Sequence, residues 1–390
     1  MKEPQKKQEW WYIWLIVLGT TLLALLASKS VIYDFSSLEV FAPIEKKVDF
    51  RLSDIYNTVE QYRSTQTLSR DIVVVSVDNC DREQTLDVIH KISDCKPKAI
   101  GLDISFAVPK DEESNAYLLE TLLFTPNLVS ASMVKKTDSI YRLEPLSFYD
   151  LDEDFEPEHT GYVNLDATHP WNVIRTFIPY VCLEGGDTLP SMPLALAQIA
   201  SPERAQQLID RANPTEIIDF TSCEIEIITS EKLDYTAVSK RLRNKIVLIG
   251  DTADQKDIYL TPLHDPTPGV MIHAYTLQTI LNGRYIRSTP LFHNWLMATI
   301  ICILFTGVLL FTRNHVNHLG SLLIRLSQFL IMYGLVWLGC LIFSIRHVYT
   351  DFAPSILMLG LGTFTLDIVN AILGICQDII NWFTNKKNEQ

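Results

Sequence analysis

Residues 246–262 read IVLIGDTADQKDIYLTP, an apolar stretch that ends at Gly250 and gives way to acidic and hydroxyl side chains. Asp251 and Asp257 follow the break, and Thr261 precedes a proline. Acidic groups directly after a buried strand can bind a cation, orient a ligand or transfer a proton. Because α/β folds place such chemistry at the carboxyl ends of their strands, we expect a candidate ligand site here.

Two earlier apolar runs end in the same way. The run DIVVVSVD ends at Asp78, and the run KAIGLDI carries Asp103 near its end. If these strands are parallel, their carboxylates share one edge of the sheet with Asp257, and two or three of them could hold a cation through hard oxygen ligands. Alternatively, the same carboxylates cap helices and bind loop amides. No resident cofactor is expected, and the identity of any metal is unknown.

Two further polar residues could join this site. His273 lies in a helix expected over 268–281 and could pair with Asp257, which would tune its imidazole. No nucleophile motif accompanies it, so we expect a hydrogen-bonded structural histidine and no enzyme activity. Arg175 could bind an anionic ligand through both guanidinium nitrogens or pair with Asp166. A structural ion pair fits Arg175 equally well.

The elements that must position these residues follow from hydrophobic periodicity. Buried strands alternate with amphipathic helices, which predicts an α/β fold with a mostly parallel, mixed sheet flanked by helices. An acidic, irregular break is expected at 149–162. The expected strands are 71–78, 98–104, 127–133, 173–183, 217–220, 225–229 and 243–250, and the expected helices are 82–94, 113–124, 190–210 and 268–281.

Four long apolar runs predict a membrane protein, because each can cross a bilayer as a helix of about 20 residues. Lys and Arg gather on one side of these spans, which places both termini in the cytoplasm. The first run is expected to remain as an uncleaved anchor. The predicted order is a tail 1–9, span 10–29, external domain 30–290, span 291–312, cytoplasmic loop 313–325, span 326–345, external loop 346–351, span 352–376 and tail 377–390.

Charge and cysteine content exclude several classes of protein. The net charge is −13, whereas nucleic-acid binding needs a basic face, so no nucleic-acid partner is expected. None of the seven cysteines has the spacing of a zinc site. A disulfide between Cys182 and Cys223 is conceivable.

The last apolar run carries polar and small residues on one helical face. Asp367, Asn370 and Asp378 share this face, and Gly360 adds a place for close packing. A carboxylate in or near the bilayer usually faces protein or water. This face is therefore a candidate contact for a partner protein, with packing inside the chain's own helical bundle as the alternative.

The segment 244–281 resembles the end of the CHASE domain of the second kind, an extracytoplasmic sensory domain of bacterial membrane receptors. The resemblance rests on NKIVLIGDTADQKDIYLTPL and PGVMIHAYTLQTIL, and it extends to DIVVVSVD, KAIGLDISF, GYVNLDATHPWNVIRTFIPY and LPSMPLALAQ. It covers about residues 45–285. The stretch NCDREQTLDVIH departs from the family's usual pattern after the first strand.

The resemblance implies a sensor or receptor subunit in a bacterial inner membrane, with an unknown small-molecule ligand. Such proteins normally continue into a cytoplasmic effector, and no effector motif follows the last span here, so a separate effector protein is expected. Receptors of this layout often form homodimers. The alternatives are a ligand-free scaffold subunit of an envelope complex and an external hydrolase that uses the Asp cluster with His273.

Overall fold

The chain forms two compact units, Asn57–Arg287 and Met1–Tyr56 with Ser288–Gln390. We call the first the α/β unit and the second the helical unit. The computed structural model describes residues 10–34, 51–64, 67–106, 110–137, 140–143, 158–165, 173–232, 235–263, 265–313 and 318–388.

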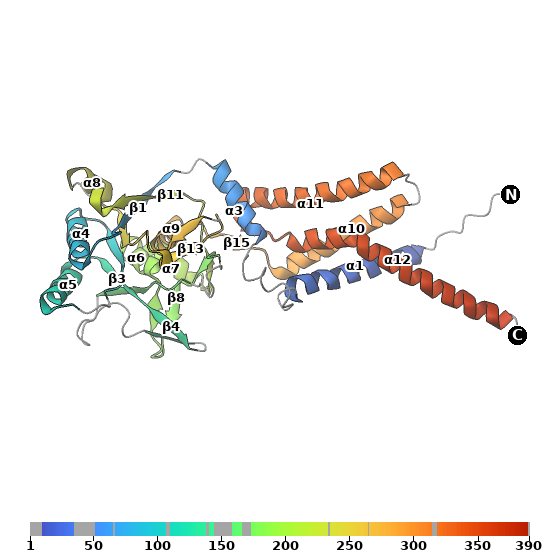
Figure 1. The fold of residues 1–390 in the computed structure, drawn as a ribbon, viewed down its shortest axis with the longest axis horizontal. Helices are drawn as coiled ribbons and strands as arrows, with labels where there is room; N and C mark the ends of the chain where they lie inside the picture. Colours follow the sequence, from blue (N-terminus) through green and yellow to red (C-terminus); the bar gives the residue numbers. More distant parts are fainter. Residues whose placement is uncertain are drawn as a thin grey trace. The chain divides into compact units, whose positions relative to one another are not determined.

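Six strands form the central sheet of the α/β unit (Figure 1). Every neighbouring pair in this sheet is parallel, so the predicted α/β class is confirmed and the main sheet has no antiparallel member. Their order is β11 (Glu224–Thr229), β1 (Leu68–Ser76), β12 (Ile246–Gly250), β2 (Ala99–Asp103), β3 (Leu128–Ser132) and β6 (His159–Tyr162).

Helices cover both faces of this sheet because its central strands are apolar on both sides. In β1, Ile72 and Val74 point into one core, whereas Val73 and Val75 point into the other. The first core is closed by α6 (Met192–Ala200), α7 (Pro202–Asp210) and α9 (Gly269–Asn282), and the second by α4 (Arg82–Asp94), α5 (Glu112–Phe124) and α8 (Tyr235–Leu242).

Short antiparallel pairs and single turns complete the α/β unit. They are β4 (Val134–Thr137) with β5 (Ile140–Leu143), β7 (Thr176–Phe177) with β10 (Glu216–Ile217), β8 (Tyr180–Cys182) with β9 (Thr188–Pro190), β13 (Ile258–Leu260) with β14 (Pro266–Pro268), and the 3₁₀ turns η1 (Ser230–Lys232) and η2 (Gln255–Asp257). The helix α3 (Leu52–Arg63) lies at the boundary between the two units.

Several predicted elements are wrong in detail. The expected strand 173–183 is two short strands in separate two-stranded sheets, interrupted at Pro179, which has no amide hydrogen. The expected helix 190–210 is two helices, because Ser201 has non-helical backbone angles (φ −154°, ψ 70°) and Pro202 begins the next helix. The strand β6 lies at the end of the stretch expected to be irregular.

Cys182 and Cys223, the conceivable disulfide pair, are not bonded to each other. Cys182 is exposed on the β8–β9 hairpin, whereas Cys223 is buried in the core beside β11. Both are free thiols. A hairpin surface and a sheet core are different environments, and the spacing of the two cysteines in the sequence does not reveal this separation.

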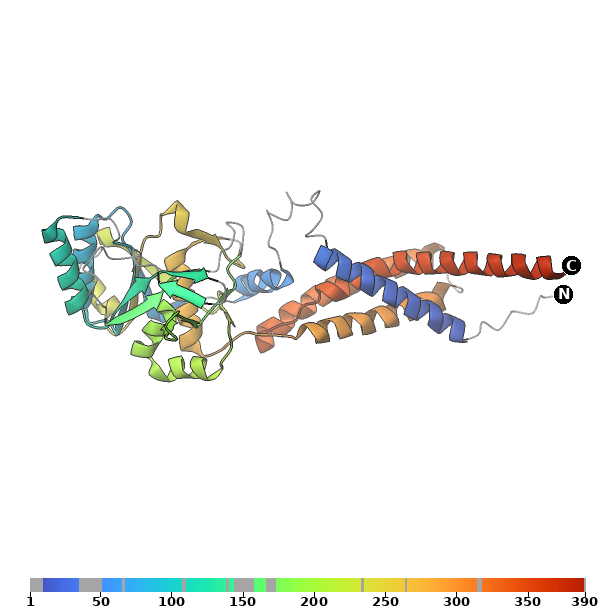
Figure 2. The same ribbon diagram turned by 90° about the horizontal axis from the view of Figure 1, so that it is seen from below.

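Within its described residues, the helical unit contains four helices long and apolar enough to cross a membrane. The helix α1 packs across α12, and α10 packs against both (Figure 2). One of its cores includes Ile16, Phe305 and Leu359. The helices are α1 (Trp10–Asp34), α10 (Leu291–Arg313), α11 (His318–Arg346) and α12 (Ala353–Asn388), and the short strands β15 (Arg287–Ser288) and β16 (Val348–Tyr349) accompany them.

The contact between β6 and α6 predicts the effect of a small substitution. A methyl group at Gly161 would lie 2.5 Å from the Cα atom of Met192, and backbone cannot move aside as a flexible side chain can. We expect Gly161→Ala to destabilise the α/β unit by about 1–3 kcal/mol, measured as thermal unfolding of the full chain in detergent. Gly185→Ala is the control, since its nearest neighbour is a side-chain oxygen at 3.6 Å; equal losses would contradict this contact.

Candidate functional site

The carboxyl ends of three central strands lie side by side. Ser76 is opposite Gly250, and Gly250 is opposite Asp103. The helix α9 packs directly onto this edge, because a methyl group at Gly250 would lie 2.8 Å from the Cβ atom of Val270. The strand ends and the first turns of α9 therefore enclose the same small volume.

Asp103 and His273 meet inside this volume. The His273 side chain is 6% exposed and that of Asp103 is 13% exposed, and His273 Nε2 lies 3.9 Å from Asp103 Oδ2. The same Nε2 is 3.2 Å from the carbonyl oxygen of Val163. Because a carbonyl oxygen only accepts, Nε2 carries the proton and donates to Val163. Within the described residues, nothing donates a hydrogen bond to the Asp103 carboxylate.

Asp257 reaches the same place from the turn η2. Its carboxylate hydrogen-bonds with the side chain of Tyr259 and the amide of Gly269, so it lies on the first turn of α9. Pro268, at the N-cap position of that helix, provides no side-chain cap. A methyl group at Gly269 would lie 2.5 Å from Asp257 Oδ2. Glycine at this position is what allows the carboxylate to approach the helix amides.

Burial changes the acidity of all three groups. Desolvation raises the pKa of Asp103 to about 7. Desolvation, and then the neighbouring charge of Asp103, raise the pKa of Asp257 to about 6. Desolvation lowers the pKa of His273 to about 4 despite the opposing charge of Asp257. Desolvation therefore shifts each of the three groups toward its neutral form, because the ion would lie in a medium of low polarity.

A second carboxylate group lies farther along the same edge. Asp78 accepts hydrogen bonds from the amide and hydroxyl of Thr252, at 2.7 and 2.9 Å. Partial burial acts to raise the pKa of Asp78, but hydrogen bonds from Ser76 and Thr252 outweigh it and hold that pKa below its usual value. Asp251 accepts from the amides of Ala253 and Asp254. These carboxylates bind loop amides, as the structural alternative predicts.

Two further predicted residues, besides Asp78 and Asp251, lie outside the Asp103–Asp257–His273 cluster. Arg175 is buried, and its Nη1 lies 3.4 Å from the carbonyl oxygen of Val173. Its suggested partner Asp166 lies outside the described residues. Thr261 is buried, and its hydroxyl has no hydrogen-bond partner among the described residues.

Sequence reasoning overlooked three contributors to the cluster, namely the Tyr259 side chain, the Gly269 amide and the Val163 carbonyl. Tyr259 and Gly269 both lie within the segments quoted above. Their contribution depends on the η2 turn folding back onto α9, which no local pattern indicates. A backbone carbonyl carries no sequence signal at all.

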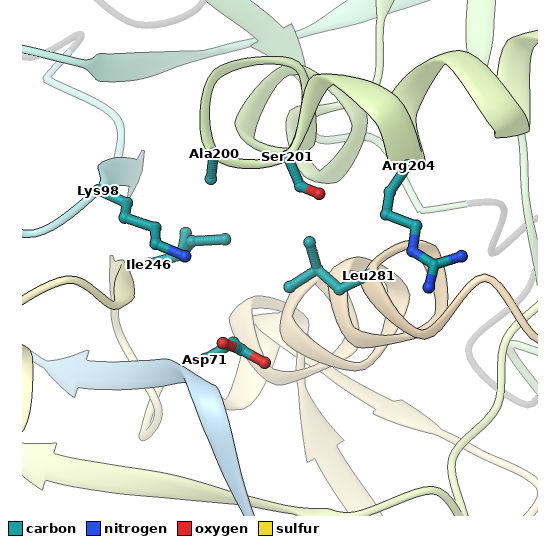
Figure 3. A pocket seen from close by; sticks show the side chains of 7 residues that line it. All are labelled: Asp71, Lys98, Ala200, Ser201, Arg204, Ile246 and Leu281. Carbon is teal, nitrogen blue, oxygen red and sulfur yellow. The ribbon is translucent and has the colours of Figure 1, made fainter.

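Among the described residues, no three His, Cys, Asp or Glu side chains gather in an arrangement that could hold a metal ion. A cleft of about 140 Å³ lies at the opposite edge of the sheet, where β1, β12 and β2 begin (Figure 3). None of its residues belongs to the predicted ligand set. They are Asp71, Lys98, Ala200, Ser201, Arg204, Ile246 and Leu281.

The residues predicted to contact a partner lie along α12 in the helical unit. Gly360, Asp367 and Asp378 are exposed, and Asn370 is half-buried. The Asn370 amide nitrogen has no hydrogen-bond partner among the described residues. Gly360, Asp367 and Asp378 are therefore uncovered within the described part of the chain, whereas the Asn370 amide nitrogen is covered.

Comparison with known proteins identifies the α/β unit. The family model of the CHASE2 domain matches residues 13–310. The chain belongs to the CHASE2 family. No curated protein and no solved structure matched the chain.

The match confirms the family that the sequence resembles. A CHASE2 domain is an extracytoplasmic sensory domain, and the matched residues include the whole α/β unit with most of α10 and most of α1. The protein is therefore a membrane-anchored CHASE2 protein. The cluster of Asp103, Asp257 and His273 lies in its sensory domain, at the carboxyl ends of the central strands.

The raised pKa of Asp103 predicts a pH-dependent stability. The folded CHASE2 domain holds this proton more tightly than the unfolded chain does. The contribution of Asp103 to the free energy of unfolding is therefore largest below its ordinary pKa of about 3.8, and it is lost as pH rises through about 7. Asp103→Asn should therefore gain stability relative to wild type as pH rises from 4 to 7, by up to about 1 kcal/mol per pH unit. Chemical unfolding of the full chain at several pH values measures this difference.

Asp78→Asn is the matched control for this series. The pKa of Asp78 is lowered in the folded state, so its stabilising contribution is lost only as pH falls below the ordinary value of about 3.8. The difference in free energy of unfolding between Asp78→Asn and wild type should stay constant between pH 4 and 7. A constant difference for Asp103→Asn as well would show that Asp103 is not held neutral by burial.

Proposed function

We propose that this CHASE2 protein is a non-enzymatic sensor or receptor subunit whose signal acts on the Asp103–Asp257–His273 cluster. One observation carries the proposal: two largely desolvated carboxyl groups lie where the central strands of a sensory domain end, and no Lys or Arg among the described residues forms an ion pair with either. Such a pair has two states close in free energy, neutral and ionised. A proton, a cation or a small basic ligand would favour one state over the other.

The connection from this cluster to the membrane is short in sequence. Asp257 contacts the first turn of α9, and only residues 283–290 separate the end of α9 from the start of α10. Ionisation of Asp257 would strengthen its bonds to the α9 amides, because a helix N-terminus favours negative charge. The resulting shift of α9 would then reach the membrane helix α10 through this link.

Catalysis is the less favoured function. His273 contacts a backbone carbonyl and a carboxylate, and among the described residues no serine, threonine or cysteine hydrogen-bonds to it. Its low pKa keeps it neutral, and its Nε2 proton is donated to Val163. This is the environment of a structural histidine, and a hydrolase would need a nucleophile within reach of its general base.

We place the protein in the inner membrane of a bacterium, with its CHASE2 domain outside the cytoplasm and both termini inside. The distribution of Lys and Arg along the spans supports this orientation. The four membrane helices would pass the signal to a separate effector protein, in a complex in which this chain is present singly or as a homodimer. The ligand-free scaffold is the competing function, and the first of the following experiments separates the two.

The proposed transmission from Asp257 through α9 to α10 predicts that residues 283–290 respond when the cluster ionises. A spin label at Arg284→Cys, with Cys182→Ser and Cys376→Ser to remove exposed thiols, should change mobility between pH 5 and 8 in the full chain. Asp103→Asn with Asp257→Asn should abolish the change, because neither amide ionises. Asp78→Asn is the control and should leave the change intact. Spectra that do not change with pH in the parent chain would favour a ligand-free scaffold.

The proposed orientation predicts which thiols a membrane-impermeant reagent reaches. Cys182 is free and exposed on the CHASE2 domain, so a charged maleimide should label it in intact cells with the outer envelope opened. Cys182→Ser should remove that label. A cysteine introduced by Asn388→Cys should react only after the inner membrane is permeabilised; labelling of both sites in intact cells would contradict the orientation.

A further inference from the structure

A carboxylate lies in the interior of the longest membrane helix. The span of α12 runs from Ala353 to Trp382, and the hydrocarbon core accommodates about 20 helical residues. Every stretch of about 20 residues that fits within this span includes Asp367. Its place inside the bilayer therefore does not depend on where the membrane boundaries are drawn.

The surface around Asp367 is open to another helix. Asp367 is exposed, and glycines lie seven residues to either side of it. A methyl group at Gly360 would meet only the end of Met332 at 3.9 Å, and one at Gly374 would meet nothing within 4 Å among the described residues. Positions seven residues apart lie on one helix face, and glycine there lets a second helix approach closely.

The polar character continues along the same face. Asn370 follows Asp367 by three residues, and its amide nitrogen is buried without a hydrogen-bond partner among the described residues. An amide donor and a carboxylate inside a bilayer both need a partner, since no bulk water reaches them there. We call Gly360, Asp367, Asn370 and Gly374 the acidic face of α12.

No cation from the described part of this chain lies at the depth of Asp367. The membrane spans contain Lys29, Arg325 and Arg346 as their only Lys and Arg residues, and Lys29 and Arg346 are the end residues of their spans. Arg325 is near the opposite end of its span from Arg346, and no described Lys or Arg forms an ion pair with Asp367. A second copy of the chain would bring another Asp367 and no cation to match it.

We propose that the acidic face of α12 binds a transmembrane helix of a different protein that carries a Lys or Arg at the depth of Asp367. The countercharge would neutralise Asp367, and the two glycines would allow the helices to pack closely. This inference rests on the proposed function, because it describes how the CHASE2 protein would hold its separate effector. It specifies the partner by chemistry: a membrane-spanning segment with a basic residue in its interior.

Affinity purification of the full chain from its native membrane in mild detergent tests the proposal. Native mass spectrometry should show a stoichiometric partner with a Lys or Arg inside a predicted span. Asp367→Asn should reduce the recovered partner at least tenfold. Ile372→Ala is the matched control, because Ile372 is exposed on a different side of α12 and should leave recovery unchanged.

A charge exchange separates a direct ion pair from an indirect effect. Asp367→Lys should also lose the partner, and replacing the partner's basic residue by Asp should restore the complex with Asp367→Lys alone. Four results would overturn the proposal: a partner retained by Asp367→Asn, a partner without a basic residue in a span, a complex made only of copies of this chain, or no complex.

These outcomes are independent of the sensor proposal. A partner lost with Asp367→Asn, together with a spin label at position 284 that never responds to pH, would support the acidic face and leave a scaffold as the function. A responsive spin label with no loss of partner would support the sensor and reject the acidic face.

Discussion

The register of the parallel sheet is the constraint on which the candidate site depends. It places Ser76 beside Gly250 and Gly250 beside Asp103, so three strands end together beneath α9. Because Gly250 and Gly269 have no side chains, α9 packs closely on the strand ends and the Asp257 carboxylate approaches the first turn of that helix. Two carboxyl groups and an imidazole then lie close together, and desolvation shifts each of them toward its neutral form.

Acidic groups lie in surroundings of low polarity at two separate places in this CHASE2 protein. In the α/β unit the medium is the protein core around Asp103, and in the helical unit it is the bilayer around Asp367. A buried carboxyl can remain neutral and respond to its surroundings, whereas a carboxylate at a lipid-facing surface is stabilised by a partner. The proposed sensing step and the proposed docking step thus rest on the same physical cost of burying charge.

Local signals predicted much of the fold. The β-branched run in β1 and the amphipathic pattern of α4 were enough to place these elements, and the parallel order brought Asp103 and Asp257 to one edge. Local signals failed where contacts between distant segments determine the structure. The strand β6 lies in an acidic stretch that does not look like a strand, and Tyr259 joins the cluster only because η2 folds back onto α9. The break at Ser201 had a local signal, the following proline, which the apolar periodicity obscured.

The ionisation of Asp103 is the most direct measure of this account. Carbon-13 nuclear magnetic resonance of aspartate carboxyl groups in the full chain, with Asp103→Asn to assign the signal, would follow this one group through a pH titration. The account predicts that Asp103 is still protonated at pH 5 and ionises near pH 7. An Asp103 carboxylate already ionised at pH 5 would contradict this prediction, because Asp103 could then not change from neutral to ionised as the pH rises.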